Sequence, residues 1–317
     1  DVVVENYSPG VMKRMGFDYE SLKQLNPRLI MCSISALGQT GPSAEVPGFD
    51  YIAQAYAGIT EVMGEPGQPP VLPMVAMGDV STGVHALAAV ACALLHRERT
   101  GEGQYIDVSL LDSYMHYHDF SLQTYTASKG KFVPTRGGAH HTGLTPCGIF
   151  KAANGGYVLL IAALDHQWRG LCRAMGQPEL ADDPRFRTVR DRLKNKKTLI
   201  EEIEKWLQSL PDRDTAVAAL ERERVPVAPV LTIPEVVRHP HLLERGTVRP
   251  ISTPDFGDIV LPGFPFRFST VPPPDRLTAP DLGEHNSAVL SRFLGYDEAR
   301  IAQLTDAGIL VQQRSKE

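Results

Sequence analysis

Asp79 is the residue in this sequence whose type and setting best suit a chemical step. It lies in the stretch M-G-D-V-S-T-G at residues 77–83, at the start of an apolar segment with helical spacing. Backbone N–H groups and the helix dipole at such a place keep a carboxylate ionised at neutral pH, as a carboxylate nucleophile requires. A second interpretation stays open, because an Asp just before a helix is most often an N-terminal cap.

A glycine-rich stretch at residues 137–143 is the second candidate for chemistry. Gly137, Gly138 and Gly143 let the backbone approach a ligand closely and turn its N–H groups toward an oxyanion. The same composition is typical of a flexible linker between domains. The local sequence does not separate these two interpretations.

The histidines do not have the spacing of a metal site. His116 and His118 are two residues apart on a predicted helix, so they point to different faces. No H-E-x-x-H or comparable spacing occurs, which predicts that the protein has no metal. The sequence also contains no G-x-S-x-G, G-x-G-x-x-G or G-x-x-x-x-G-K-[ST] motif.

The composition narrows the class of protein and its partners. The chain has 317 residues, 43% of them hydrophobic and 22% charged, which suits one large or two ordinary globular domains. The net charge is −5 and no long basic run occurs, so we expect no nucleic-acid partner. No apolar run approaches the roughly 20 residues of a membrane span, so we expect no membrane partner.

Four widely separated cysteines indicate the redox environment. They form no C-x-x-C pair and each lies in or beside an apolar stretch. We interpret them as buried free thiols in a reducing compartment, and we expect a cytoplasmic protein.

Strand-like and helix-like stretches alternate along the first third of the chain. Residues 2–4, 29–34 and 105–108 have the pattern of strands, and residues 84–95 have the clearest helical spacing, with Ser81 or Thr82 as its predicted cap. This alternation is typical of an α/β layer with parallel strands. The opening D-V-V-V-E has no initiator Met and resembles a strand entered part-way, so we expect an N-terminal segment to be missing.

The later segments predict a second unit of mixed helices and strands. We therefore expect four regions: 1–120, part of a large α/β domain; 121–144, a linker that carries the glycine loop; 145–230, a small α+β domain; and 231–317, a return linker and the C-terminal part of the large domain.

An ordered set of segments resembles the class III CoA-transferase (CaiB/BaiF) family. Each tetrapeptide alone is a weak signal, but the ordered set is specific and covers essentially the whole chain. The matching segments are V-E-N-Y-S-P-G at 4–10, R-M-G at 14–16, L-N-P-R-L-I at 25–30, G-Q-T-G-P at 38–42, P-G-F-D at 47–50, G-D at 78–79 with T-G at 82–83, R-E-R-T-G-E-G-Q at 97–104 and L-G-E-H at 282–285.

The resemblance implies a site, its substrates and an assembly. Asp79 becomes the nucleophile, and acyl-CoA and a carboxylic acid become the substrates. The family's active-site glycine loop matches residues 137–143 only loosely. The implied fold is a Rossmann-like large domain with a parallel sheet plus a smaller α+β domain, in an interlocked homodimer. The implied contacts to CoA come from Asn6, Tyr7, Ser8, Arg14, Val46, Pro47, Gly48 and Phe49.

The resemblance also implies a reaction, to which there are two alternatives. In the implied reaction, CoA passes from the donor to the acceptor acid through an aspartyl-CoA thioester on Asp79. α-Methylacyl-CoA racemases share the fold but use a His where this chain has Phe49, and Phe cannot accept a proton, so we rank that reaction lower. The second alternative is a CoA-binding fragment or subunit without catalytic activity.

Overall fold

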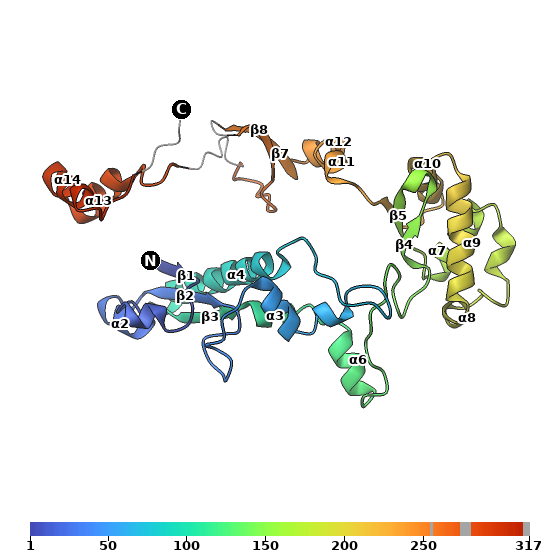
Figure 1. Ribbon diagram of the computed structural model, residues 1–317, viewed down its shortest axis with the longest axis horizontal. Coiled ribbons are helices and arrows are strands. Elements are labelled where there is room, and N and C mark those ends of the chain that lie inside the picture. The colour runs from blue at the N-terminus through green and yellow to red at the C-terminus, as the bar shows by residue number, and fades with distance from the viewer. Residues whose placement is uncertain (254–255, 273–279, 313–317) are drawn as a thin grey trace. The chain divides into compact units, whose positions relative to one another are not determined.

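The computed structural model describes residues 1–253, 256–272 and 280–312, which divide into two compact units, Asp1–Pro229 and Val230–Glu317 (Figure 1). The first unit contains two separate sheets with their own helices. Within the described residues, the strands are β1 Val2–Glu5, β2 Ile30–Ser35, β3 Tyr105–Ser109, β4 Cys147–Lys151, β5 Tyr157–Ile161, β6 Val227–Pro229, β7 Val248–Thr253 and β8 Gly257–Pro262.

The first sheet is parallel, with strand order β1-β2-β3. Cys32 of β2 pairs with Val4 on one side and Ile106 on the other, so β2 is the central strand. Five of the six residues of β2 are buried, as expected for a parallel strand covered on both faces. The predicted α/β class with a parallel sheet is confirmed.

Helices connect and cover the strands of this sheet. The longest, α4, packs against β2 and β3 and against α3 and α5. A small apolar cluster between α3 and α5 contains Ala53, Leu110 and Tyr114. The helices of this part are α1 Val11–Arg14, α2 Tyr19–Leu25, α3 Asp50–Tyr56, α4 Met77–Thr100, α5 Leu110–Met115 and α6 Ser121–Ala127, with a 3₁₀ turn at Thr60–Val62.

The start of α4 differs from the sequence prediction. The sequence places the N-cap at Ser81 or Thr82, but the observed N-cap residue is Ala76, which has no capping side chain, and the helix begins at Met77. Asp79 therefore lies inside the first turn rather than before it. Its side chain is not the N-terminal cap that the local sequence left open.

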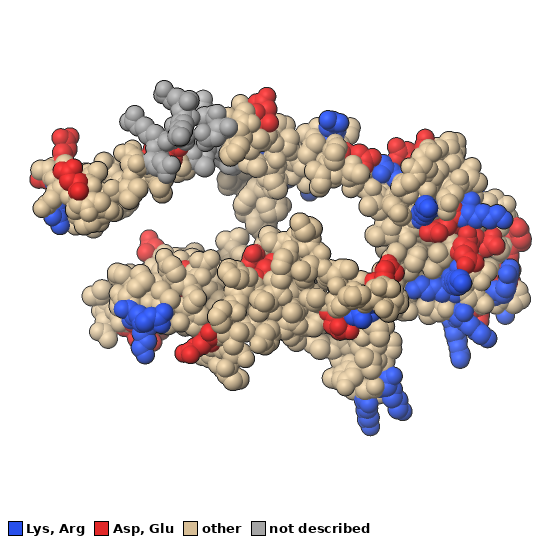
Figure 2. All heavy atoms as spheres, in the orientation of Figure 1, with Lys and Arg blue, Asp and Glu red and all other residues tan. Residues whose placement is uncertain are grey.

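The second sheet is antiparallel, with order β4-β5-β6, and has a larger core. Phe150, Leu160 and Trp168 are among the side chains buried between this sheet and its helices. Figure 2 shows basic and acidic side chains interspersed over this part of the surface. Its helices are α7 Asp165–Ala174, α8 Val189–Lys194, α9 Lys196–Ser209 and α10 Arg213–Arg222.

In the described part of the second unit lie the β7–β8 antiparallel hairpin and four helices. The hairpin pairs Val248 with Pro262 and Thr253 with Gly257. The helices are α11 Ile233–Val236, α12 Pro240–Glu244, α13 Asn286–Leu294 and α14 Glu298–Asp306.

Two features of the composition can be compared with the structure, the apolar stretch in α4 and the cysteines. By length and composition, α4 is apolar enough to cross a membrane, with a mean hydropathy of 1.5 over its best 18 residues. This is weak support for a span, because a helix that covers a sheet passes the same test. All four cysteines are free, and Cys32 and Cys172 are buried as predicted, but Cys147 is only half-buried and Cys92 is exposed.

Candidate active site

Asp79 lines a pocket of about 510 Å³ at the end of the parallel sheet. The walls come from the end of β1, the end of β2, the loop before α3 and the first two turns of α4, because the carboxyl ends of parallel strands meet at one edge of a sheet. The lining residues are Val4, Glu5, Asn6, Ile34, Ser35, Ala36, Gly48, Phe49, Asp79, Gly83 and Leu110.

The pocket brings together four of the residues predicted from sequence. Asn6, Gly48 and Phe49 line the same cavity as Asp79, although they are up to 73 positions apart in the chain. The Phe49 side chain is 82% exposed, so its ring is available to the pocket rather than packed in the core. The lining contains no histidine, lysine or arginine.

The Asp79 carboxylate is accessible and its pKa is perturbed. Within the described residues, it has no ion pair and accepts no side-chain hydrogen bond. Partial burial in the pocket, and then the negative charge of Asp50, raise the pKa of Asp79 above its ordinary value of 3.8. Both effects raise the pKa of Asp79, whereas the helix dipole, which the sequence predicts as the main influence, acts to lower it.

The start of α4 is capped from another helix. Asp50, the first residue of α3, accepts a hydrogen bond from the Gly78 N–H at 3.3 Å and one from the Asp79 N–H at 3.4 Å. The Tyr114 hydroxyl of α5 also accepts from the Gly78 N–H, at 3.0 Å. These two N–H groups are therefore occupied and are not free to bind an oxyanion.

Asp50 and Tyr114 were not singled out by the sequence analysis. Asp50 ends the matched P-G-F-D segment, and Tyr114 lies in none of the matched segments. A local signal did exist for α3, because Asp50 and Gln54 are four residues apart and so share a helix face. That both are almost fully buried is visible only in the structure.

The other predicted CoA contacts lie around the site with different surroundings. Arg14 lines a second pocket, of about 460 Å³, with Pro9, Gly10 and the loop at residues 39–45. Ser8 lines a third, smaller pocket. Tyr7, Val46 and Pro47 are exposed on the surface.

The glycine stretch does not reach the Asp79 pocket in this structure. Gly138 donates its N–H to the Gly64 carbonyl at 3.0 Å, and Gly143 donates to Nδ1 of His141 at 3.0 Å. Neither these residues nor Gly137 are among those that line the cavity. A role for the stretch at an oxyanion stays a prediction.

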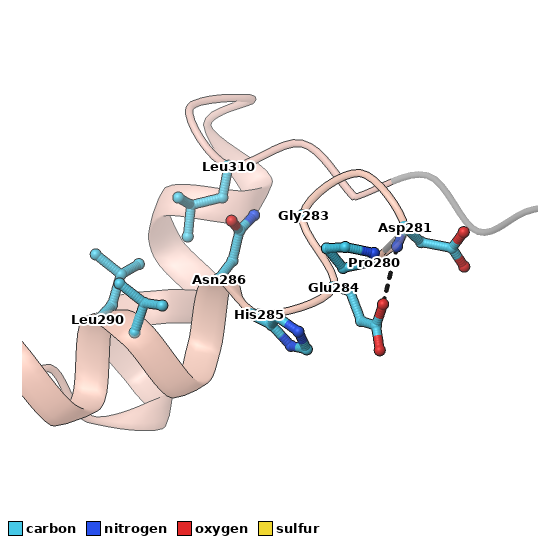
Figure 3. Close-up of a pocket in the computed structure, with 9 residues that line it drawn as sticks. Pro280, Asp281, Gly283, Glu284, His285, Asn286, Leu290 and Leu310 are labelled. Atoms are coloured by element: carbon cyan, nitrogen blue, oxygen red, sulfur yellow. Dashed lines mark hydrogen bonds between the residues drawn. The ribbon is translucent and has the colours of Figure 1, made fainter. Parts of the chain in front are cut away.

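A separate pocket, of about 300 Å³, lies in the second unit at the matched L-G-E-H segment (Figure 3). The Asp281 N–H donates to Oε2 of Glu284 at 2.8 Å, and the Glu284 N–H donates back to the Asp281 carbonyl at 3.1 Å. These bonds close a turn just before α13. Glu284 therefore has a local structural role here. No group of three or more possible metal ligands occurs among the residues that the structure describes.

Comparisons with known proteins show the family of the chain. Residues 1–286 match the model of CoA-transferase family III. The chain is 34% identical to the succinyl-CoA:glutarate CoA-transferase of Mus musculus, covering 100% of this chain and 72% of that protein. It is 37% identical to the acetyl-CoA:oxalate CoA-transferase of Acetobacter aceti, covering 92% and 74%.

A solved structure shows the same fold. The crystal structure of a CaiB/BaiF family protein from Brucella suis superposes with a TM-score of 0.78 at 34% identity, covering 92% of this chain and 75% of that chain. Sequence and fold point to the same assignment, and the resemblance stated from the motifs is confirmed. The chain belongs to CoA-transferase family III.

Proposed function

We propose that this enzyme moves CoA from an acyl-CoA to a free carboxylic acid, with the Asp79 carboxylate as nucleophile. The observation that carries the proposal is the position of Asp79. Its carboxylate faces a pocket at the end of the parallel sheet, and no ion pair holds it among the described residues. A free carboxylate in a cavity can attack a thioester carbonyl.

The first half of the reaction loads CoA onto the enzyme. An Asp79 oxygen attacks the thioester carbonyl, the carbon–sulfur bond breaks, and a mixed anhydride and CoA thiolate result. The thiolate then attacks the Asp79 carbonyl carbon. The anhydride carbon–oxygen bond breaks, the donor acid leaves as its carboxylate, and an aspartyl-CoA thioester remains. Covalent catalysis of this kind divides one difficult exchange into easier steps.

The second half repeats these steps in reverse with another acid. The acceptor carboxylate attacks the aspartyl-CoA thioester and expels CoA thiolate, which leaves an anhydride between Asp79 and the acceptor. The thiolate attacks the acceptor carbonyl, and Asp79 returns as a free carboxylate. The nucleophile of each step is an ionised group, which is the Asp79 carboxylate, the acceptor carboxylate or the CoA thiolate, so activity depends on pH.

We place the CoA contacts along the loop after β1. Asn6 lines the Asp79 pocket, next to where the thioester must lie. Arg14 lines the second pocket, and its guanidinium lies over Gly10, where an added Cβ would be 3.0 Å from Nη1. A guanidinium binds phosphate oxygens with two parallel hydrogen bonds, so Arg14 suits the phosphates of CoA.

Substitution of Asp79 tests the proposal directly. Full-length Asp79→Ala and Asp79→Asn variants should lose at least about 10³-fold in kcat, because the nucleophile is gone while the pocket remains. The assay should combine succinyl-CoA or acetyl-CoA as donor with glutarate or oxalate as acceptor, since relatives use these. Circular dichroism should show an unchanged fold. A variant with a near-normal rate would exclude Asp79 as the nucleophile.

A chemical trap gives an independent readout of the intermediate. Hydroxylamine added during turnover should convert the activated side chain of Asp79 to a hydroxamate, which peptide mass spectrometry locates. The Asp79→Asn variant is the control and should give no hydroxamate. A hydroxamate at another carboxylate would identify that residue as the nucleophile in place of Asp79.

Proton exchange at the α-carbon has less support than transfer. Phe49 stands at the position where the racemases carry a His, and it lines the Asp79 pocket with its ring exposed. A phenyl ring cannot take a proton. We expect no deuterium uptake at the α-carbon of a 2-methylacyl-CoA in D₂O without an acceptor acid, and rapid uptake would reverse this ranking.

A further inference from the structure

A buried polar group lies directly beneath the proposed nucleophile. Asp50 is 7% exposed and its two carboxylate oxygens face the first turn of α4, one toward the Gly78 N–H and one toward the Asp79 N–H. A helix leaves its first four N–H groups without partners inside the helix. Asp50 therefore supplies, from α3, the acceptor that α4 lacks at its own N-cap residue, Ala76.

The position of Asp50 is fixed by a chain of side-chain hydrogen bonds. The Tyr114 hydroxyl donates to Oδ1 of Asp50. Nε2 of Gln54 donates to the Tyr114 hydroxyl at 3.2 Å, and the Thr60 hydroxyl donates to Oε1 of Gln54 at 3.0 Å. Gln54 and Tyr114 are fully buried, so these side chains cannot rearrange without breaking hydrogen bonds at a place that water does not reach.

The Tyr114 hydroxyl keeps its proton over the whole physiological range. Burial, and then the hydrogen bond to Asp50, raise its pKa to about 12. It therefore remains a donor to Asp50 at every pH at which the enzyme works. The same oxygen accepts the Gly78 N–H, so one hydroxyl connects α3, α5 and the start of α4.

We propose that Asp50 and Tyr114 are positioning residues that cap α4 in place of Asp79 and so leave the Asp79 carboxylate free to attack the thioester. This inference rests on the proposed role of Asp79 as nucleophile. An acidic side chain in the first turn of a helix tends to fold back onto the free N–H groups there. The N–H groups of Gly78 and Asp79 are already bonded to Asp50. The Asp79 side chain therefore gains little by folding back onto them.

The negative charge of Asp50 also keeps Asp79 basic. A like charge nearby disfavours a second carboxylate, and a more basic carboxylate is the better nucleophile once ionised. The titratable side chains around the start of α4 include Asp50 from α3 and Tyr114 from α5, which bond the N–H groups there, and Glu5 from β1, which lines the Asp79 pocket. The strand β2 contributes only Ile34 and Ser35 to the lining, and β3 contributes no residue.

Two substitutions in the full-length protein separate positioning from general stability. Asp50→Asn removes the charge but keeps one acceptor, and Tyr114→Phe removes the hydroxyl but keeps the ring. Each should lower kcat about 10-fold or more with little change in KM for the acyl-CoA, because small misplacements of a reacting group are costly. In Asp50→Asn the acidic limb of the pH–rate profile should move to lower pH, because the loss of the Asp50 charge lowers the pKa of Asp79. In Tyr114→Phe, which keeps that charge, we expect a smaller movement of the limb.

Asp212→Asn is the matched control. Asp212 caps α10 by accepting the Thr215 N–H at 2.7 Å, so it is also an N-terminal capping acid, but on a helix that contributes nothing to the Asp79 pocket. It should leave kcat and the pH profile unchanged. If Asp50→Asn does not fold, Tyr114→Phe still tests the proposal through kcat.

The outcomes distinguish this inference from the proposed function. Folded Asp50→Asn and Tyr114→Phe variants with normal kcat and an unmoved acidic limb would overturn the positioning role, while loss of activity in Asp79→Asn would still support the nucleophile. Full activity in Asp79→Asn would overturn both. A reduced kcat in Asp50→Asn with an unmoved limb would show that Asp50 acts only as structural support and would overturn its charge effect.

Discussion

Gly78, the residue next to the proposed nucleophile, is the most tightly surrounded position of the site. A Cβ at Gly78 would lie 2.6 Å from Oδ1 of Asp50 and 2.9 Å from Cζ of Tyr114, well inside normal contact distances. The backbone φ angle here needs no glycine, so the requirement comes from the close approach of two buried side chains. This explains in physical terms why a Gly precedes the Asp in the matched G-D segment.

Replacement of Gly78 tests this close approach. Gly78→Ala should lower the free energy of unfolding by about 1–3 kcal/mol, as overpacking of a buried site does, and should reduce kcat because Asp50 and Tyr114 must move. Urea denaturation and steady-state kinetics give the two values. Gly83→Ala on the same helix is the stability control, since nothing lies within 4 Å of its added Cβ, and it should stabilise α4 by about 0.5–1 kcal/mol. Equal losses in both variants would contradict the packing explanation.

At the scale of residues, the sequence indicates the proposed nucleophile, Asp79, better than it indicates the residues that contact the start of its helix. Asp79 stands out because its neighbours match a family motif and its helix has clear periodicity. Asp50 and Tyr114 do not stand out, because their importance depends on contacts across 28 and 36 positions of chain. A hydrogen bond between residues so far apart leaves no spacing pattern for a single sequence to show.

At the scale of elements, α4 shows why a helix boundary can be misplaced. Sequence rules look for a capping side chain next to the first turn, and Ser81 and Thr82 satisfy that rule. The capping acid of α4 comes instead from α3, so the helix can begin at Met77 after a residue with no capping group. The three strands of the parallel sheet were predicted to within one residue at each end, because their apolar pattern is local.

The core of the antiparallel part contains a buried cation that connects its segments. Arg192 of α8 has no exposed surface, and its guanidinium donates to the carbonyls of Thr145, Phe186 and Ala163 at 2.9 to 3.2 Å. It also lies over the ring of Trp168, with 5.3 Å between Cζ and the ring centre. One side chain thus joins the segment before β4, the end of β5, α7 and α8.

Loss of this guanidinium should weaken the antiparallel part. Arg192→Met should lower the free energy of unfolding by about 3 kcal/mol or more, because three carbonyls lose a buried donor. Arg169→Met is the control: Arg169 pairs with Asp182 at 3.1 Å on the surface, and its loss should cost about 1 kcal/mol or less. Tryptophan fluorescence reports this core, since Trp168 and Trp206 both lie in it or against it. Similar losses in the free energy of unfolding in the two variants would contradict this structural role of Arg192.

At the scale of the whole molecule, we propose the interlocked homodimer that the family resemblance implies. Sedimentation equilibrium of the full-length protein should give twice the mass of one chain. Tagged and untagged subunits should form mixed dimers on co-expression but not after separate purification and mixing, because threaded rings cannot exchange without unfolding. Rapid exchange of folded subunits would contradict interlocking and leave an ordinary dimer. The cytoplasmic location stays a prediction that cell fractionation can check.

At the start of α3, the adjacent side chains of Phe49 and Asp50 have separate surroundings. The ring of Phe49 is 82% exposed in the pocket, while the carboxylate of Asp50, one position later, is 7% exposed beneath α4. A change at position 49 alters the chemical character of the cavity wall and leaves the support under the helix intact. The residue at position 49 can therefore be exchanged without redesigning the fold around it.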